Sequence, residues 1–168
     1  MSDTVIINSQ QVDDLLNKLN DKEQKNKWLY DAVMSGAKVL QQSAQQSFIR
    51  KVDGASHNSP YLKGNKPFYE GVSVKGDKAY CEASVSIMND FRMKFFEKGT
   101  DERHTNSRKI TGYQEDGKHL KREGKGHYTG KITATYFFRE ARDSSDSAIN
   151  EAMMLSIDKS IKNAISYI

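Results

Sequence analysis

The fold is organised around residues 20–52, which read NDKEQKNKWLYDAVMSGAKVLQQSAQQSFIRKV. Small and apolar side chains recur along it at helical spacing: Leu29, Val33, Gly36, Ala37, Leu40, Ala44 and Phe48. Polar residues occupy the other faces, and no proline interrupts the run. Asn20 suits an N-cap, and Glu23 completes a capping-box pattern three residues later. The stretch therefore predicts one long amphipathic helix.

Two segments flank this helix. Residues 1–20 carry Val12, Leu15, Leu16 and Leu19 at helical spacing, which predicts an N-terminal arm or short helix. Residues 53–68 are rich in glycine, proline, serine and asparagine, which predicts a linker made of turns.

The clearest strand signal follows at residues 72–87. Apolar residues alternate with polar ones in its second half: Ala79, Cys81, Ala83, Val85 and Ile87. Gly76-Asp77 lies between the two runs, and glycine tolerates the backbone of a tight turn. The pattern predicts a β-hairpin that turns at Gly76-Asp77, with its apolar face covered by the long helix.

The rest of the chain predicts a short helix over 90–98 that ends at Gly99, a glycine-rich loop over 101–130, a strand over 132–137 and a final helix over 145–167. The fold class that follows is α+β: a small antiparallel β-sheet (hairpin plus a third strand) packed against a long N-terminal helix and a C-terminal helix. We expect residues 1–168 to form a single domain.

Composition narrows the class of protein further. The net charge is +4 and the pI is about 9.0, which permits contact with nucleic acid or an acidic surface without requiring it. A single cysteine, Cys81, excludes an internal disulfide and a cysteine-based zinc cluster. No apolar run is long enough for a membrane span, and the first residues do not resemble a signal peptide. We expect a protein made in the cytosol, without membrane contact.

Basic charge is concentrated between Arg103 and Lys131, where eight basic and three acidic residues give a balance of +5. The candidate contacts to a partner or to DNA are Arg103, Arg108, Lys109, Lys118, Lys121, Arg122 and Lys125. Rings at Tyr113, His119 and Tyr128 are interleaved with them. Cations beside aromatic rings hold phosphates and stack on bases, so DNA is one candidate partner. A solvated loop and a loop that folds onto an acidic neighbouring subunit are the other interpretations.

Catalytic patterns are weak. Three of the four histidines (His57, His104, His119 and His127) lie in the 101–130 loop among carboxylates, where a metal-dependent nuclease site is conceivable. Their spacing is irregular, and solvated histidines are the simpler interpretation. Cys81 falls on the apolar face of the predicted strand, which favours a core thiol over a nucleophile. We expect no catalytic residue, no metal and no cofactor.

Two short motifs flank the basic loop. They are Phe95-Phe96-Glu97-Lys98-Gly99-Thr100 and Phe137-Phe138-Arg139-Glu140-Ala141. The aromatic residues favour a core or a subunit interface. Within them Glu97, Gly99, Thr100, Phe137, Phe138 and Ala141 are the candidate motif residues. We expect Glu97 to accept hydrogen bonds that fix a turn, and Gly99 to allow its backbone.

With these motifs and this order of elements, residues 20–167 resemble the tail-completion (head–tail joining, or neck) proteins of long-tailed bacteriophages and prophages. The resemblance implies a non-enzymatic structural protein of the virion, made in the bacterial host cytoplasm. It also implies a ring of subunits that binds a head-side connector protein on one face and a tail tube or terminator protein on the other. The alternative is a small nucleic-acid-binding protein or metal-dependent nuclease that uses the 101–130 loop.

Overall fold

The computed structural model describes residues 17, 20–104, 109–113, 120–123 and 126–166. Its elements are α2 (Lys22–Lys51), η1 (Phe68–Gly71), β1 (Ser73–Asp77), β2 (Glu82–Ser86), α3 (Met93–Lys98), β3 (Arg103–His104), β4 (Lys109–Tyr113), β5 (Leu120–Glu123), β6 (Tyr128–Gly130) and α4 (Phe137–Ser166). The α+β class, with small antiparallel sheets and two long helices, is confirmed. The arm or helix predicted over residues 1–20 lies almost entirely outside the described residues.

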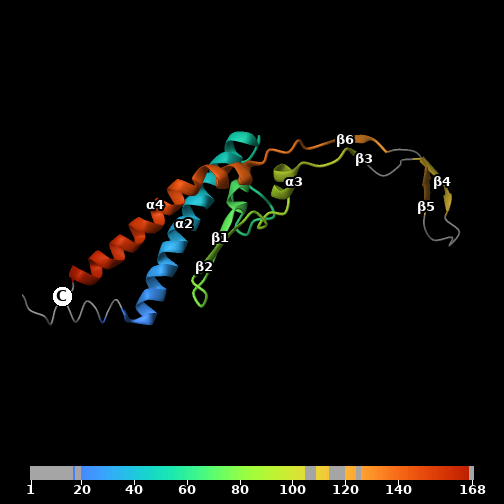
Figure 1. Cartoon of the computed structure of the whole chain (residues 1–168). Coiled ribbons are helices and arrows are strands. Elements are labelled where there is room, and N and C mark those ends of the chain that lie inside the picture. Colours follow the sequence, from blue (N-terminus) through green and yellow to red (C-terminus); the bar gives the residue numbers. More distant parts are fainter. Residues whose placement is uncertain (1–16, 18–19, 105–108, 114–119, 124–125, 167–168) are drawn as a thin grey trace, which may run out of the picture.

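The body is built on two long helices that run antiparallel and diverge away from the core (Figure 1). Small side chains allow their approach: a Cβ atom at Gly36 of α2 would lie 2.9 Å from Cγ of Met153 on α4. Nearer the core, Ser145 Oγ donates to Ser43 Oγ at 2.8 Å. Lys51 Nζ, at the end of α2, contacts Glu140 Oε2 in the first turn of α4 at 2.5 Å.

Helix α2 begins one residue later than expected. Its N-cap is Asp21, whose side chain accepts a hydrogen bond from the Glu23 N–H at 3.0 Å, and not Asn20. A carboxylate is a strong N-cap and also complements the positive end of the helix dipole. The predicted length of this helix is confirmed.

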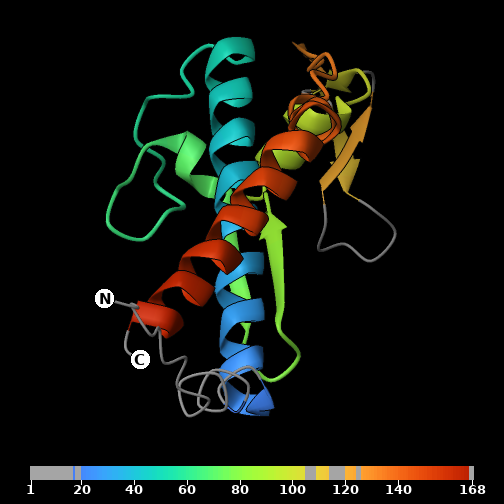
Figure 2. The ribbon, with the colours of Figure 1, turned by 60° about the vertical axis from the view of Figure 1, so that its left-hand side comes forward.

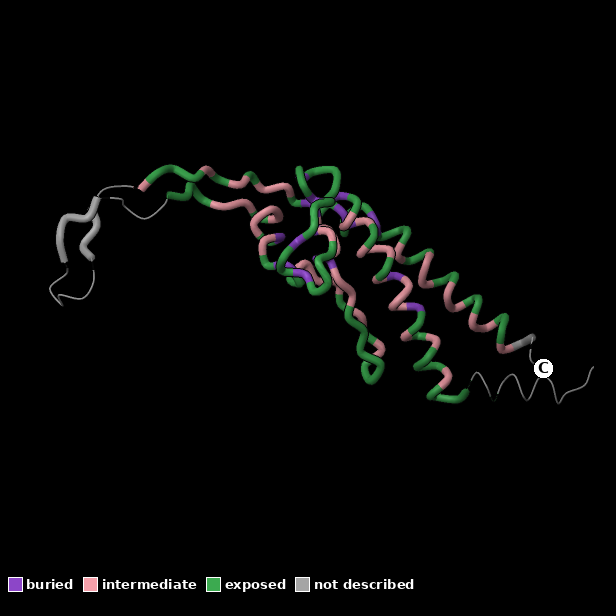
Figure 3. Tube along the Cα trace, turned by 180° about the vertical axis from the view of Figure 1, so that it is seen from behind, coloured by how far each residue is buried: buried purple, intermediate pink, exposed green. Residues whose placement is uncertain are grey.

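The core sits where α2, α4, η1 and α3 meet (Figure 3). Phe48 is its centre, with ring centroids of Phe137 at 4.7 Å, Phe68 at 5.0 Å and Phe96 at 5.8 Å. Aromatic pairs at these distances bury large apolar areas and add favourable edge contacts. The predicted linker is part of this arrangement, because Ala55 and Leu62 are buried.

The hairpin β1–β2 packs along α2, as its apolar face predicts, but the predicted position of its turn is wrong. Gly76 and Asp77 belong to β1, where they pair with Ala83 and Glu82, and the turn spans residues 78–81. Two local features move it: the Asp77 carboxylate accepts from the Ala79 N–H at 2.9 Å, and Cys81 takes a left-handed φ of 51°. An Asx-type hydrogen bond favours a turn directly after the aspartate.

Glycine is needed at position 76 for a different reason than a turn. A Cβ atom there would lie 2.4 Å from the Tyr30 hydroxyl and 2.6 Å from the Met34 sulfur. Gly76 therefore lets the strand lie close against α2.

The segment predicted as a loop with a strand after it is organised differently. Strand β3 pairs with β6 and β4 pairs with β5, so the described parts of residues 101–131 run out and back as a projecting ribbon (Figure 1). The predicted third strand over 132–137 does not join the hairpin. Residues 131–136 instead run beside the end of α3, and α4 begins at Phe137, eight residues earlier than predicted.

Candidate functional site at the base of the ribbon

The two sequence motifs meet at the base of the projecting ribbon. Both carboxylate oxygens of Glu97 accept backbone hydrogen bonds from the start of α4, from the Phe138 N–H at 2.8 Å and from the Arg139 N–H at 3.1 Å. The first N–H groups of a helix have no partner within the helix, and a carboxylate there also meets the positive end of the helix dipole. Glu97 thus caps α4 from a position 40 residues earlier in the chain, and the expected acceptor role is present in the structure.

Gly99 and Thr100 hold the returning segment, residues 131–136, which connects the ribbon to α4. Gly99 has φ 75° and ψ −178°, and a Cβ atom there would lie 3.0 Å from both the Ala134 nitrogen and the Ile132 oxygen. The Thr100 N–H donates to the Ile132 oxygen at 2.9 Å, and the Ile132 N–H donates to Thr100 Oγ1 at 2.9 Å. Only glycine combines this backbone with so close a neighbour, so the pair fixes where the ribbon leaves the body.

The aromatic motif residues are divided between core and surface. Phe137 and Ala141 are buried, and Phe138 and Phe96 pack against the same core while remaining partly exposed. Tyr136 turns the chain into α4 with a φ of 49°, and its backbone N–H donates to the backbone carbonyl oxygen of Glu97 at 3.2 Å. All six candidate motif residues therefore gather at one junction.

An open groove of about 530 Å³ lies at this junction. Among its lining residues are Phe95, Lys98, Asp101, Lys131 and Thr133, so aromatic, basic and acidic groups share it. Its walls come from the end of α3 and from residues 131–134, and both lead into the ribbon.

The ribbon places the candidate basic residues in different ways. Arg103 lies on β3 and is exposed. Lys109 is on β4, and Lys121 and Arg122 are on β5, in a ladder that sets Lys109 opposite Glu123 and Arg122 opposite Ile110. Arg108, Lys118 and Lys125 lie outside the described residues.

The histidines expected in this segment do not gather in its described part. His104 on β3 faces Tyr128 on β6, with ring centroids 5.4 Å apart, and its Nδ1 lies 3.4 Å from the Gly126 oxygen. His57 is exposed in the linker, His127 is exposed at the return of the ribbon, and His119 lies outside the described residues. Across the described ranges, no three histidine, cysteine or carboxylate side chains group closely enough to hold a metal ion.

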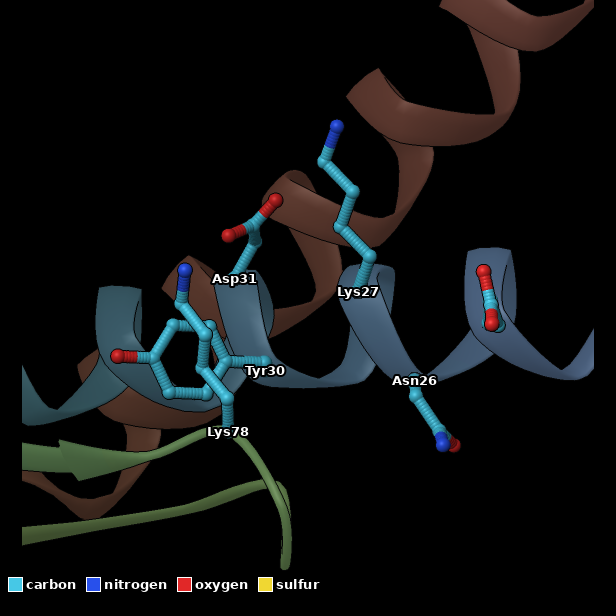
Figure 4. A pocket seen from close by; sticks show the side chains of 6 residues that line it. Asn26, Lys27, Tyr30, Asp31 and Lys78 are labelled. Carbon is cyan, nitrogen blue, oxygen red and sulfur yellow. The ribbon is translucent and has the colours of Figure 1, made fainter.

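Cys81 is not on the face of a strand, as the sequence predicted. It lies in the turn of the hairpin, where its Sγ donates to the Asn26 oxygen at 3.4 Å. Nearby, an open pocket of about 340 Å³ lies between this turn and the first half of α2 (Figure 4). Lys78 lies over the Tyr30 ring there, 5.8 Å from its centroid. These contacts attach the hairpin turn to α2.

One polar cluster has no signal in the sequence: Ser59, Asp90 and Arg92. Asp90 is fully buried, and Arg92 donates to its two oxygens from Nε at 3.0 Å and from Nη2 at 2.7 Å. Ser59 Oγ also donates to Asp90, and the guanidinium lies over the rings of Tyr61 and Phe68. Only an alignment that paired positions 59 and 90 would have revealed it, since they are 31 residues apart.

The charge state of this cluster follows from its geometry. Burial alone would raise the pKa of Asp90, but the hydrogen bonds from Arg92 and Ser59 outweigh it, so the pKa of Asp90 is lowered. The hydrogen bond to Asp90 raises the pKa of Arg92. The pair therefore stays ionised and ties the linker to the segment before α3.

No protein-family model, curated protein or solved structure matches this chain. Within the described residues, no helix has the length and apolar character required to cross a bilayer.

Proposed function

We propose that this chain is a structural subunit of a bacteriophage or prophage virion that joins head and tail, acts through binding without catalysis, and needs no cofactor. It assembles into a ring in the neck, between a head-side connector protein and a tail tube or terminator protein. The proposal rests on the resemblance of its two motifs and its order of elements to tail-completion proteins.

The observation that best supports it is the junction at the base of the ribbon. Glu97 and Thr100 bind the start of α4 and Ile132 of the returning segment through four hydrogen bonds that involve backbone groups, and Gly99 allows the close approach. A motif that is used to fix the exit of a projecting element suits a protein whose task is to present that element to a neighbour.

The ribbon itself has the properties of a contact element. Its described base is exposed, with Arg103, His104, Tyr128 and Thr129 open to solvent. The ribbon extends away from the two long helices in Figure 1, and Figure 2 shows it foreshortened on the side of α3. Two-stranded ribbons are marginally stable alone in water. Covering by a neighbouring subunit, or by DNA that passes through the ring, would stabilise it.

Complementation of a phage that lacks this gene, with a ribbon-shortened variant, tests the proposal. Residues 105–125 are replaced by a short glycine-serine turn, which leaves the paired strands β3 and β6 at the base of the ribbon in place. We expect unjoined heads and tails to accumulate with the variant, while the full chain restores tailed particles. Circular dichroism and thermal unfolding of the variant control for the fold of the body.

The alternative function, a small nucleic-acid-binding protein or metal-dependent nuclease, predicts a different result. His104 and Tyr128 lie ring to ring at the base of the ribbon, and Arg103 precedes His104 on β3, so basic and aromatic residues suited to a nucleic-acid contact are present there. A nuclease would cleave DNA when a divalent metal is added, and His104→Ala would reduce that cleavage. Metal-dependent cleavage by the purified chain, together with full complementation by the ribbon-shortened variant, would contradict the structural role.

A further inference from the structure

We propose that copies of this chain bind head to tail, with an aromatic patch of one copy on an acidic stripe of the next. The aromatic patch is Tyr61, Phe91 and Phe95, with Lys94 beside it. The acidic stripe is Glu151, Met154, Leu155 and Asp158 on α4. This inference rests on the proposed function, because it names the surfaces through which a ring of subunits forms.

The aromatic patch is exposed and already ordered. Tyr61 is 56% exposed and Phe91 is 43% exposed, although both are large rings. Their centroids are 5.1 Å apart, and those of Phe91 and Phe95 are 6.2 Å apart. Arg92, held by the buried Asp90, orders the patch, because its guanidinium lies 4.6 Å from the Tyr61 centroid.

Rings held in place in this way bind at low entropic cost, since few rotamers are lost on binding. Aromatic residues are also enriched among the side chains that dominate interface energies. The patch has basic neighbours: Lys94 Nζ lies 5.1 Å from the Phe95 centroid, and Lys63 is exposed two residues after Tyr61.

The acidic stripe has the complementary chemistry. Positions 151, 154, 155 and 158 follow the spacing that puts residues on one face of a helix. Met154 and Leu155 are each 61% exposed at its centre, and Glu151 and Asp158 are exposed on either side. From Asp143 to Asp158, α4 carries four acidic residues and no basic one, and Lys159 follows directly. Asp143 is ion-paired with Arg142, so the negative charge of the stripe itself comes from Glu151 and Asp158.

A second copy of this chain is the occupant that these surfaces favour, because a single chain carries both halves of the contact. Apolar side chains flanked by cations on one surface match apolar side chains flanked by carboxylates on the other. The two halves cannot meet within one copy, since α3 and the second half of α4 lie at opposite ends of the body (Figure 1). A contact between two different surfaces is heterologous, and such contacts close into rings when the rotation between copies allows it.

The test uses two variants that each break one half. A patch variant carries Tyr61→Ser and Phe91→Ser, and a stripe variant carries Met154→Ser and Leu155→Ser. Sedimentation velocity is measured over a concentration series for each variant alone, for the wild-type chain, and for an equimolar mixture of the two variants. Tyr80→Ser and Leu29→Ser serve as matched controls, because both remove exposed apolar side chains outside the two surfaces.

We expect the wild-type chain and both controls to associate beyond dimers as concentration rises, and each variant alone to remain a monomer. The mixture has one intact patch and one intact stripe, so it should form a dimer and nothing larger. The association should weaken as salt is raised, since charge pairs flank the contact.

A wild-type chain that is still monomeric at about 1 mM, the range of the weakest specific contacts, overturns the inference, and so do variants that associate as the wild type does. Dimers formed by each variant alone indicate an isologous contact and overturn it as well. Each of these results leaves the complementation experiment unaffected. If the patch variant loses binding to an acidic protein or to DNA but still self-associates as the wild type does, the patch binds that other partner and the inference is overturned.

Discussion

At the residue scale, the carboxylates Glu97 and Asp90 show what this chain uses buried or half-buried charge for. Both oxygens of Glu97 accept backbone N–H groups of α4, and both oxygens of Asp90 accept hydrogen bonds. Neither carboxylate therefore has a free oxygen pointed at a cavity. Each holds together segments of the chain that are distant in sequence.

The buried pair predicts a pH dependence of stability. Asp90 has a lowered pKa in the folded chain, whereas an unfolded aspartate titrates at about 3.9. The unfolded state thus binds more protons in this range, so the stabilisation is complete above that value and is lost as the pH falls through the folded pKa. Asp90→Asn should cost about 2 kcal/mol at pH 7, because it removes charge-assisted hydrogen bonds and leaves the partly exposed Arg92 without its counter-charge.

The cost of Asp90→Asn should shrink as the pH falls below about 3.9, because the unfolded wild-type chain then takes up a proton at this aspartate that the folded chain, with its lowered Asp90 pKa, does not. Urea unfolding at pH 7, 5 and 3 measures it, with Asp53→Asn as an exposed control. A difference between Asp90→Asn and wild type that stays constant across this range would contradict the assigned ionisation.

At the scale of elements, the decisive feature is the way the ribbon is attached. Gly99 and Gly64 both have positive φ, at 75° and 85°, but they differ in surroundings. A Cβ atom at Gly99 meets backbone atoms at 3.0 Å, whereas one at Gly64 has nothing within 4 Å. Substitution at Gly64 therefore measures the free-energy cost of the left-handed backbone alone, whereas substitution at Gly99 adds the cost of the close contact.

Gly64→Ala should destabilise the chain by about 1 kcal/mol, the cost of a left-handed alanine. Gly99→Ala should cost about 3 kcal/mol, because its backbone conformation is nearly restricted to glycine and the backbone of residues 132–134 must also shift. Thermal or urea unfolding of both variants measures the difference. Equal costs would mean that the backbone of residues 132–134 yields freely, and the ribbon would then not be fixed by this glycine.

Sequence periodicity was sufficient for the elements that bury a regular face. The pattern from Leu29 to Phe48 predicts α2, and Gly99 marks the end of α3. Periodicity predicts the wrong structure where a single side chain determines the backbone conformation. Asp77 moves the hairpin turn by its own hydrogen bond, and the Glu97 cap allows α4 to start at Phe137, in a segment whose alternation resembles a strand.

The candidate site was predicted in part for the same reason. The residues of the two motifs were identified from their order along the chain, and they meet at one junction. The Ser59–Asp90–Arg92 cluster was missed, because its members are ordinary polar residues whose partners are set by the tertiary fold.

At the scale of the whole molecule, the chain combines a small core with several exposed elements that suit contact with neighbours. The core is concentrated where the helices converge, while the described base of the ribbon and the second half of α4 are exposed or half-buried (Figure 3). Tyr61 and Phe91 of the aromatic patch are exposed. Ordered exposed apolar surfaces are typical of proteins that assemble. This distribution agrees with the proposed place of the chain in a ring.

The most direct measurement is the position of this protein in purified phage particles, by electron microscopy of virions labelled with an antibody against the chain. We expect label at the neck, between head and tail, and none on particles from a phage that lacks the gene. Purified, infectious particles that carry no copy of the protein would contradict it.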